Sequence, residues 1–124
     1  MSKYHSRKIT IDGENFDSQK EARRWQALRL LERAGQIQGL RRQVRFELIP
    51  PQYETTTRYS KKTGKRLKDE EKLVERGVYY IADFVYSRPD GAMVVEDTKG
   101  VQTPEYIIKR KLMLKVHGIK ILET

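Results

Sequence analysis

Three charged residues interrupt or close two otherwise apolar segments near the middle of the chain. Asp83 interrupts the apolar run 78–86, and Asp97 and Lys99 close the run 92–99. Because side chains alternate along a strand, Asp97 and Lys99 share a face. Two carboxylates from neighbouring strands suit a hard divalent cation such as Mg²⁺ or Mn²⁺. With such an ion, the trio favours hydrolysis of a phosphodiester, in which Lys99 orients the attacking water or stabilises charge on the phosphate.

A plainer interpretation of the same residues stays open. Asp97 and Lys99 would form an ion pair at a strand edge, and Asp83 would cap a bulge. A buried carboxylate is costly without a partner, however, and the convergence of three polar residues on apolar strands favours a functional site. Glu96 adds an ambiguity, because it is also acidic and precedes Lys99 by three residues. Strand alternation favours Asp97 and leaves Glu96 as a secondary candidate.

Glu21 is an acidic candidate from a helix. The apolar spacing and the flanking residues predict a helix over 19–34. Glu21 precedes Trp25 by four residues and Leu28 by seven, which places it on the buried side of the first turn. A competing interpretation gives Glu21 only a capping role, because Ser18 and Glu21 have the spacing of a capping box.

A framework of strands and helices must position these residues. The β-branched and aromatic residues of 78–99, with a tight turn at 88–91, predict an antiparallel hairpin at the centre of the domain. The element order predicts a single α/β (α+β) domain over residues 1–124, with a mixed sheet flanked by helices. The expected elements are a strand at 8–13, a helix at 19–34, strands at 41–49, 78–86 and 92–99, a helix from 104 to about 116 and a strand at 119–122.

Residues 50–76 form a long charged segment with almost no periodicity. Two interpretations stay open: a mobile functional loop, which connections of this length often are, or a two-stranded excursion that turns at Thr63-Gly64. Four cations near this turn are candidates for contacts with a nucleic-acid backbone, which position the ligand but do not read its sequence. They are Lys61, Lys62, Lys65 and Arg66.

The composition bounds the class of protein. The chain has 124 residues and a formal net charge of +9, from 26 Lys and Arg against 17 Asp and Glu. This surplus favours a polyanionic partner, and we favour nucleic acid over a membrane surface or a merely solubilising charge. The absence of Cys excludes disulfides, thiolate zinc sites and cysteine nucleophiles, and His5 and His117 lack the spacing of a catalytic pair. With no apolar run of membrane or secretory type, we expect a soluble cytoplasmic protein.

The motif residues resemble a known group of enzymes. Asp83 followed by Asp97-Thr98-Lys99 is similar to the signature of the PD-(D/E)XK nuclease superfamily, an Asp and then (Asp/Glu)-x-Lys on the next strand. Ala82 stands where the signature has Pro. Three segments more closely resemble small phage and prophage proteins of the DUF1064 type, which are usually left uncharacterised or described as resolvase-like endonucleases of this superfamily. These segments are 16–22, 80–84 and 96–100.

The resemblance implies a restriction-endonuclease-like fold and a role for each main candidate. Asp83 and Asp97 would be metal ligands, and Lys99 would be the catalytic lysine. Glu21 would be the helix acid that completes or supports the metal site. The central antiparallel hairpin would carry the site.

Weaker candidates come from the second helix and from the strand at 41–49. Lys111 lies four residues after Ile107 and three before Leu114, which predicts that it faces the site. The superfamily often supplies a basic residue from this helix, so Lys109 and Lys111 are candidates for nucleic-acid binding. A solvated basic face explains each of them singly. Related endonucleases often carry a glutamine where this chain has Gln43, which is a further candidate.

The resemblance also implies an activity. We expect a Mg²⁺- or Mn²⁺-dependent DNA endonuclease, selective for branched or Holliday-junction DNA in phage DNA metabolism within the bacterial cytoplasm. We expect it to act as a homodimer, without a small-molecule cofactor or a membrane partner. The alternative is a non-catalytic nucleic-acid-binding accessory protein that retains the nuclease fold. A small RNA-binding protein would explain the charge but not Asp83 together with Asp97 and Lys99.

Overall fold

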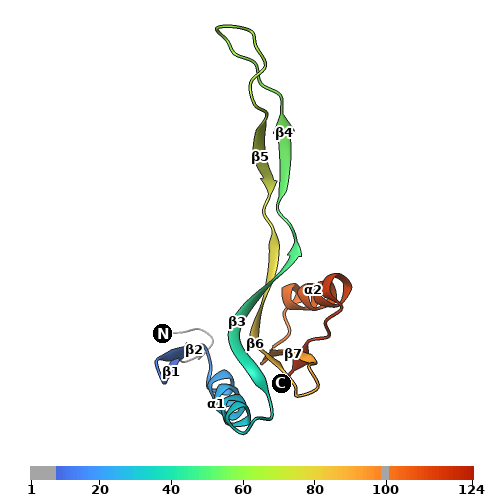
Figure 1. The fold of residues 1–124 in the computed structure, drawn as a ribbon. Coiled ribbons are helices and arrows are strands. Elements are labelled where there is room, and N and C mark those ends of the chain that lie inside the picture. The colour runs from blue at the N-terminus through green and yellow to red at the C-terminus, as the bar shows by residue number, and fades with distance from the viewer. Residues whose placement is uncertain (1–7, 99–100) are drawn as a thin grey trace.

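In the described part of the chain, a four-stranded mixed sheet with helices packed on it forms the body, and a long hairpin projects from that body (Figure 1). The computed structural model describes residues 8–98 and 101–124. The mixed α/β class expected from the sequence is confirmed there. The elements are β1 (Ile9–Ile11), β2 (Glu14–Phe16), α1 (Gln19–Arg33), β3 (Gln38–Ile49), β4 (Gln52–Thr56), β5 (Glu70–Glu75), β6 (Val78–Ser87), β7 (Met93–Asp97), α2 (Pro104–Leu112), the π-helical η1 (Met113–His117) and β8 (Leu122–Glu123).

The main sheet has the strand order β3-β6-β7-β8. The β6 strand pairs antiparallel with β3 on one side and with β7 on the other, and β8 adds in parallel to β7. The expected central hairpin is therefore β6–β7. Its turn is closed by a hydrogen bond of 2.9 Å from the Gly91 amide to the Arg88 carbonyl, and Gly91 takes a positive φ of 87° that glycine tolerates at little cost.

Helix α1 packs on one end of the sheet beside the small β1–β2 hairpin (Figure 1). It begins at Ser18, whose Oγ accepts a hydrogen bond of 3.1 Å from the Glu21 amide. Trp25 and Leu28 pack with Phe84 of β6 and form the first of two clusters of buried side chains in the core. The rings of Trp25 and Phe84 are stacked with centroids 6.1 Å apart. The apolar stripe of α1 is thus narrow, which leaves other leucines of the helix exposed.

Helix α2 and the turn η1 cover a second cluster on the sheet. Tyr106 and Met113 pack there with Tyr80 and Val95. The expected second helix thus passes from α-helical to π-helical geometry before Gly118 ends it with a positive φ of 67°. In residues 8–98 and 101–124, no helix combines the length and apolarity that crossing a bilayer requires.

The segment 50–76 is the two-stranded excursion rather than an irregular loop. The β4 and β5 strands pair antiparallel and extend the line of β3 and β6 away from the body (Figure 1). The chain reverses near Gly64, which has a φ of 69° and donates its amide to the Ser60 carbonyl at 2.9 Å. Every residue of β4 and β5 is exposed. We call β4, β5 and the connection 57–69 the arm.

Candidate functional site

The antiparallel register of β6 and β7 brings Asp83 and Asp97 to the same end of the hairpin. Phe84 pairs with Glu96, so Asp83 and Asp97 are the next residues across the ladder. The Asp83 carboxylate accepts hydrogen bonds from the amide and the hydroxyl of Thr98, at 2.8 and 3.0 Å. The expected juxtaposition of the two strand carboxylates is therefore present in the backbone register.

The Asp97 carboxylate is buried among aromatic side chains beneath α2. It accepts a hydrogen bond of 2.6 Å from the Tyr80 hydroxyl. Burial, reinforced by the charge of Asp97, raises the pKa of Tyr106 to about 12. Burial and the hydrogen bond to Asp97 also raise the pKa of Tyr80. Both phenols therefore stay protonated at neutral pH beside the Asp97 carboxylate.

Glu21 turns its carboxylate toward the sheet. The side chain is buried, and one oxygen accepts hydrogen bonds of 3.3 Å from Arg42 and from Gln43. Burial raises the pKa of Glu21, the charge of Asp83 raises it further, and Arg42 acts in the opposite direction. The capping interpretation is thus incomplete, because the helix is capped by Ser18 while the Glu21 carboxylate faces the sheet. Glu21 and Asp83 are close enough to repel each other.

An irregularity in β3 and β6 lies at the level of this site. Gln43 has a positive φ of 52°, and it lies across from Asp83 between two regular pairs of the ladder. Ala82 and Phe84 of β6 are two residues apart and would share a face in a regular strand. In the structure, Ala82 packs in the core cluster beneath α2, whereas Phe84 packs in the core cluster beneath α1. The faces that the two strands bury therefore exchange at Gln43 and Asp83. A non-glycine residue at positive φ is strained, and such strain is common at functional sites.

This exchange corrects one expectation from the sequence. In a regular strand over 78–86, Asp83 would share a face with Ile81 and Val85. The structure instead leaves 53% of Ile81 exposed and buries Val85 completely. The regular alternation of buried and exposed side chains along β6 ends at Asp83. Its side chain is half-buried where the buried face of the strand changes.

Glu96 is held on the opposite face from Asp97. Its carboxylate is fully buried and accepts two hydrogen bonds of 2.7 Å from the Arg24 guanidinium and a third from the Tyr86 hydroxyl. The hydrogen bond to Glu96 raises the pKa of Arg24, and burial with that carboxylate raises the pKa of Tyr86 to about 12. This geometry favours a structural role for Glu96 and leaves Asp97 as the better candidate at the site.

Among the residues that the structure describes, the basic candidates of α2 lie apart from one another. Lys99 lies outside the described residues. Lys109 lines a cavity of about 260 Å³ next to Tyr80 and makes an ion pair of 3.0 Å with Glu105. Lys111 is exposed and lines a separate cavity of about 300 Å³ between α2 and β8, so the expectation that it faces the site is wrong. Helix geometry explains the difference. Lys109 follows buried Tyr106 by three residues and shares its face of the helix, whereas Lys111 follows it by five and does not.

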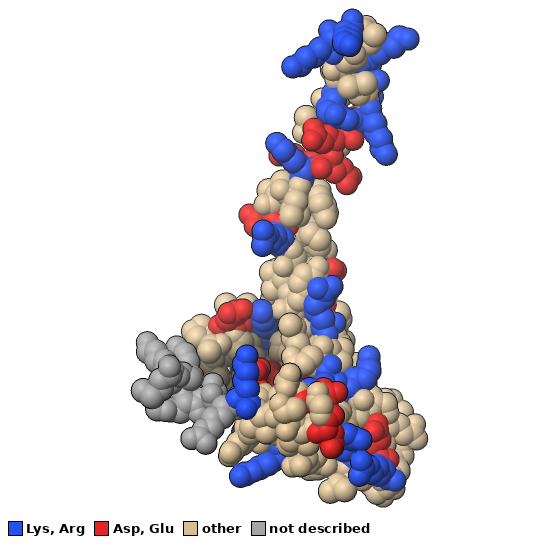
Figure 2. All heavy atoms as spheres, turned by 90° about the vertical axis from the view of Figure 1, so that its left-hand side faces the viewer, with Lys and Arg blue, Asp and Glu red and all other residues tan. Residues whose placement is uncertain are grey.

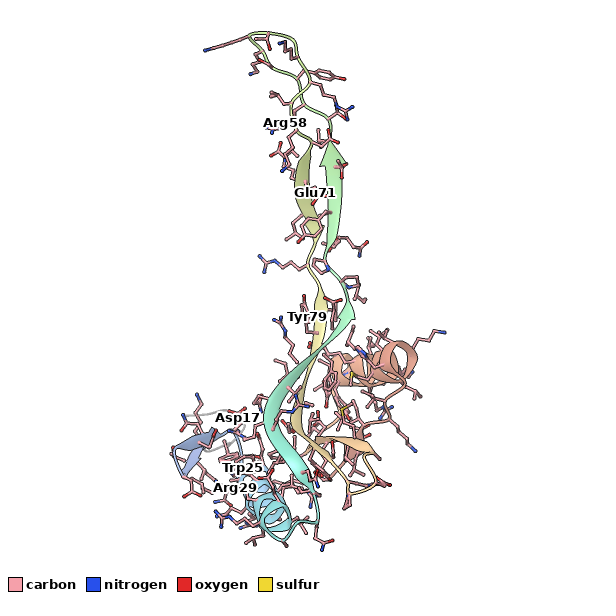
Figure 3. All side chains as sticks on the ribbon, viewed as in Figure 1. Asp17, Trp25, Arg29, Arg58, Glu71 and Tyr79 are labelled. Carbon is pink, nitrogen blue, oxygen red and sulfur yellow. The ribbon has the colours of Figure 1, made fainter. Side chains whose placement is uncertain are left out.

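The four basic candidates of the arm, Lys61, Lys62, Lys65 and Arg66, are exposed at its tip. Figure 2 shows Lys and Arg side chains gathered there, with acidic side chains below them. In Figure 3, Arg58 and Glu71 lie far along the arm, whereas Trp25 lies in the body. The arm candidates and the acidic residues therefore form two separate regions of the molecule.

The donor chemistry at the site suits a hard divalent cation. The candidate ligands Glu21, Asp83 and Asp97 offer only carboxylate oxygens. The negative charges of Glu21 and Asp83 repel each other, and a bound cation would relieve this repulsion. Within residues 8–98 and 101–124, however, no three His, Asp or Glu side chains are already grouped to hold a metal. A shared ion would require Asp83 and Asp97 to turn from Thr98 and Tyr80.

A family model described as "Protein of unknown function (DUF1064)" matches residues 1–121. The chain belongs to the DUF1064 family. The resemblance to DUF1064-type proteins expected from the sequence is therefore confirmed. No curated protein and no solved structure matches the chain. Membership of the wider nuclease superfamily stays a prediction.

The sequence reasoning overlooked several partners of the candidate carboxylates. Arg42 contacts Glu21 at 3.3 Å and also lies 3.9 Å over the Phe16 ring. Thr98 binds Asp83, and Tyr80 binds Asp97. The only sequence signals were indirect: Arg42 precedes Gln43, and Thr98 is the middle residue between Asp97 and the following lysine.

Proposed function

We propose that this protein is a Mg²⁺-dependent DNA endonuclease with a restriction-endonuclease-like fold. The observation that carries the proposal is that three elements bring Glu21, Asp83 and Asp97 to one region of the sheet, although no three acids of the described residues are already grouped to hold a metal. Asp83 and Asp97 lie next to each other at the same end of the β6–β7 hairpin. The charge of Asp83 also acts on buried Glu21 of α1 and raises its pKa. Proteins seldom bury like charges together without a cation or a catalytic use for them.

Each residue has a defined task in this proposal. Asp83 and Asp97 would bind Mg²⁺ or Mn²⁺, and Glu21 would complete or support the site. Arg42 and Gln43 hold the Glu21 carboxylate on the sheet side of α1. A bound divalent cation supplies the activation of water and the polarisation of the phosphodiester. Lys99, by resemblance, would stabilise the charge that develops on the phosphate.

The substrate class follows from charge and from the resemblance. Cations on the arm and on α2, with a net charge of +9, favour a nucleic-acid backbone. Resemblance to resolvase-like endonucleases favours branched DNA as the substrate. It also favours a homodimer, and ends that carry 5′-phosphate and 3′-hydroxyl groups.

One observation favours the second candidate, a non-catalytic nucleic-acid-binding protein. Asp83 already accepts two hydrogen bonds from Thr98, and Asp97 accepts one from Tyr80. Such contacts would stabilise the two carboxylates in the absence of a metal. A protein that had kept the fold only to bind nucleic acid would need no metal to stabilise these two carboxylates.

A cleavage assay separates the two candidates. Wild type, Asp97→Asn and Asp83→Asn are incubated with supercoiled plasmid and with a four-way junction, in Mg²⁺, Mn²⁺ or EDTA. Glu123→Gln is the matched control, because it removes one carboxylate from the exposed end of β8. We expect metal-dependent cleavage by wild type and by the control, and loss of cleavage in both Asp variants.

Three outcomes count against the nuclease proposal. Equal cleavage by wild type and Asp97→Asn would refute the assignment of the site. Binding of the junction without cleavage in any of several metals would favour the accessory protein. A strong preference for RNA over duplex and branched DNA would favour an RNA-binding protein.

A further inference from the structure

The charge of the arm is segregated along its length. Residues 58–68 contain six Lys and Arg and no Asp or Glu. Three consecutive acids, residues 69–71, follow directly, and Glu54 lies on the paired strand opposite Lys72. We call 58–68 the basic tip, and we call Glu54 with residues 69–71 the acidic band. Figure 2 shows the blue tip above the red band.

The basic tip is far from the candidate acidic site. Gly64 turns the arm, and the chain returns to Asp83 through β5 and β6, nineteen residues later. At about 3.3 Å per residue of strand, the separation from Asp83 is roughly 50 Å for Lys68 at the base of the tip and roughly 60 Å for Gly64 at its end. Duplex DNA rises 3.4 Å per base pair, so this length equals roughly 15–18 base pairs.

The acidic band determines how DNA can meet the arm. A phosphate backbone attracted to the tip would be repelled by the exposed carboxylates of Glu70 and Glu71 immediately behind it. We therefore expect a duplex bound at the tip to leave the arm at the acidic band instead of following it down to the body. The attractive regions are the tip at one end and the basic surface of the body at the other.

We propose that the basic tip binds a second segment of DNA backbone, separate from the segment at the acidic site. The acidic band keeps these two contacts apart. This inference rests on the proposed function, because the acidic site must bind the first segment. It specifies the substrate as DNA that presents two backbone segments roughly 50–60 Å apart, as a branched molecule with long arms does.

A second copy of this chain is the other conceivable occupant of the arm. The side chains of Tyr53, Leu73 and Val74 are more than half exposed below the acidic band. These apolar residues lie outside the tip, where exposed Tyr59 and Leu67 stand among six Lys and Arg and no Asp or Glu. The charge therefore favours a polyanion at the tip, and self-association is an outcome that the experiment must detect.

Binding without cleavage tests this proposal. Affinities are measured by fluorescence anisotropy in EDTA, in an Asp97→Asn background, for four-way junctions with arms of about 8 or about 25 base pairs. The tip variant combines Lys61→Gln, Lys62→Gln, Lys65→Gln and Arg66→Gln. The matched control neutralises four exposed cations of the body, Lys20, Arg23, Arg33 and Lys115.

The tip variant should discriminate between the two junctions. For the long-armed junction we expect its affinity to fall about 10- to 100-fold near 0.1 M salt, and its salt slope to fall by about 2–4. For the short-armed junction we expect a change within about 2-fold. The body control should weaken both junctions by a similar factor. Glu70→Gln with Glu71→Gln should strengthen binding to linear duplex and reduce the preference for the long-armed junction.

Each remaining outcome has a definite meaning. Equal losses on short and long arms, or no loss on either, would overturn the proposal. A wild type that dimerises in sedimentation velocity, with a monomeric tip variant of unchanged DNA affinity, would assign the arm to a second copy. If wild type never cuts DNA but the dependence on arm length persists, the proposed function fails while the two-segment binding holds.

Discussion

Glu96 and Asp97 are consecutive residues of β7, and their carboxylates serve opposite faces of the sheet. Glu96 accepts hydrogen bonds of 2.7 Å from Nε and from Nη2 of Arg24 on the α1 side. Asp97 is bound by the Tyr80 hydroxyl at 2.6 Å on the α2 side. Adjacent acids thus have different environments, which separates a structural carboxylate from a candidate metal ligand.

The first prediction concerns the stability that Glu96 provides. Arg24→Met leaves the buried Glu96 carboxylate without its cation, so we expect the free energy of unfolding to fall by about 2–4 kcal/mol. The figure lies below that of a fully buried pair because Arg24 is partly exposed. Urea denaturation measures it. Arg110→Met, which breaks a more exposed pair with Glu123, should cost about 1 kcal/mol or less. Equal losses in the two variants would contradict the assignment.

The second prediction concerns the pH dependence of stability. The pKa of Glu21 is raised in the folded protein, so the folded state holds this proton more tightly than the unfolded chain does. Ionisation of Glu21 therefore destabilises the fold as pH rises from about 4.5 through the folded pKa. Relative to wild type, Glu21→Gln should gain stability over that range, and Mg²⁺ should stabilise wild type more than the variant. Melting temperatures between pH 4 and 8 measure both effects.

A control defines what would contradict this pH prediction. Glu47→Gln removes an exposed carboxylate from β3 and should follow the wild-type profile. If Glu21→Gln also follows the wild-type profile, burial and Asp83 do not perturb Glu21 in solution. The repulsion that supports the metal proposal would then be absent.

The third prediction separates the strain at Gln43 from its contact with Glu21. A left-handed conformation costs a non-glycine residue about 1–2 kcal/mol, and glycine gives back about 0.5–1 kcal/mol through chain entropy. Gln43→Gly should therefore fold with unchanged or slightly greater stability. It should cut DNA about 10-fold more slowly, because Glu21 loses a positioning contact. Gln43→Val should instead lose about 1–3 kcal/mol of stability. A Gln43→Gly variant with full activity would show that Gln43 does not position Glu21.

The fourth prediction concerns the arm. A two-stranded ribbon exposed on both faces has little stability of its own, and its tip is rich in Lys and Arg. Trypsin should therefore cut first after the Lys and Arg residues of 58–68, and mass spectrometry should find final products close to 1–58 and 69–124. The basic residues Lys109 and Arg110 lie in α2 and should resist cleavage. First cuts within α2 would contradict this order of stability.

The sequence predicted the parts of the fold in which local pattern and burial agree. The hairpin of β6 and β7 combines apolar strands with a tight turn, and α1 combines the Ser18 cap with buried Trp25 and Leu28. The exchange of faces at Gln43 was not predictable, because a regular strand was the simplest reading of alternating residues. The Gln43 side chain donates a hydrogen bond to Glu21 of α1, which lies 22 residues away in the chain.

Two other features resisted prediction for different reasons. The strands of the arm are exposed on both faces, so nothing in their sequence has to alternate. The partners of Glu96 and Glu21 are distant in the chain: Arg24 lies 72 residues from Glu96, and Arg42 lies 21 residues from Glu21. Composition and spacing identified the acidic residues but did not identify the cations that hold them.

A crystal soaked in Mn²⁺ tests the central claim most directly. Anomalous scattering near the manganese edge reports the position of the ion without assuming a reaction. We predict one strong peak bounded by the carboxylates of Asp83 and Asp97, with Glu21 beside it, and loss of that peak in Asp97→Asn. No peak there in well-diffracting soaked crystals, or a peak held only by exposed acids such as Glu123, would contradict the account.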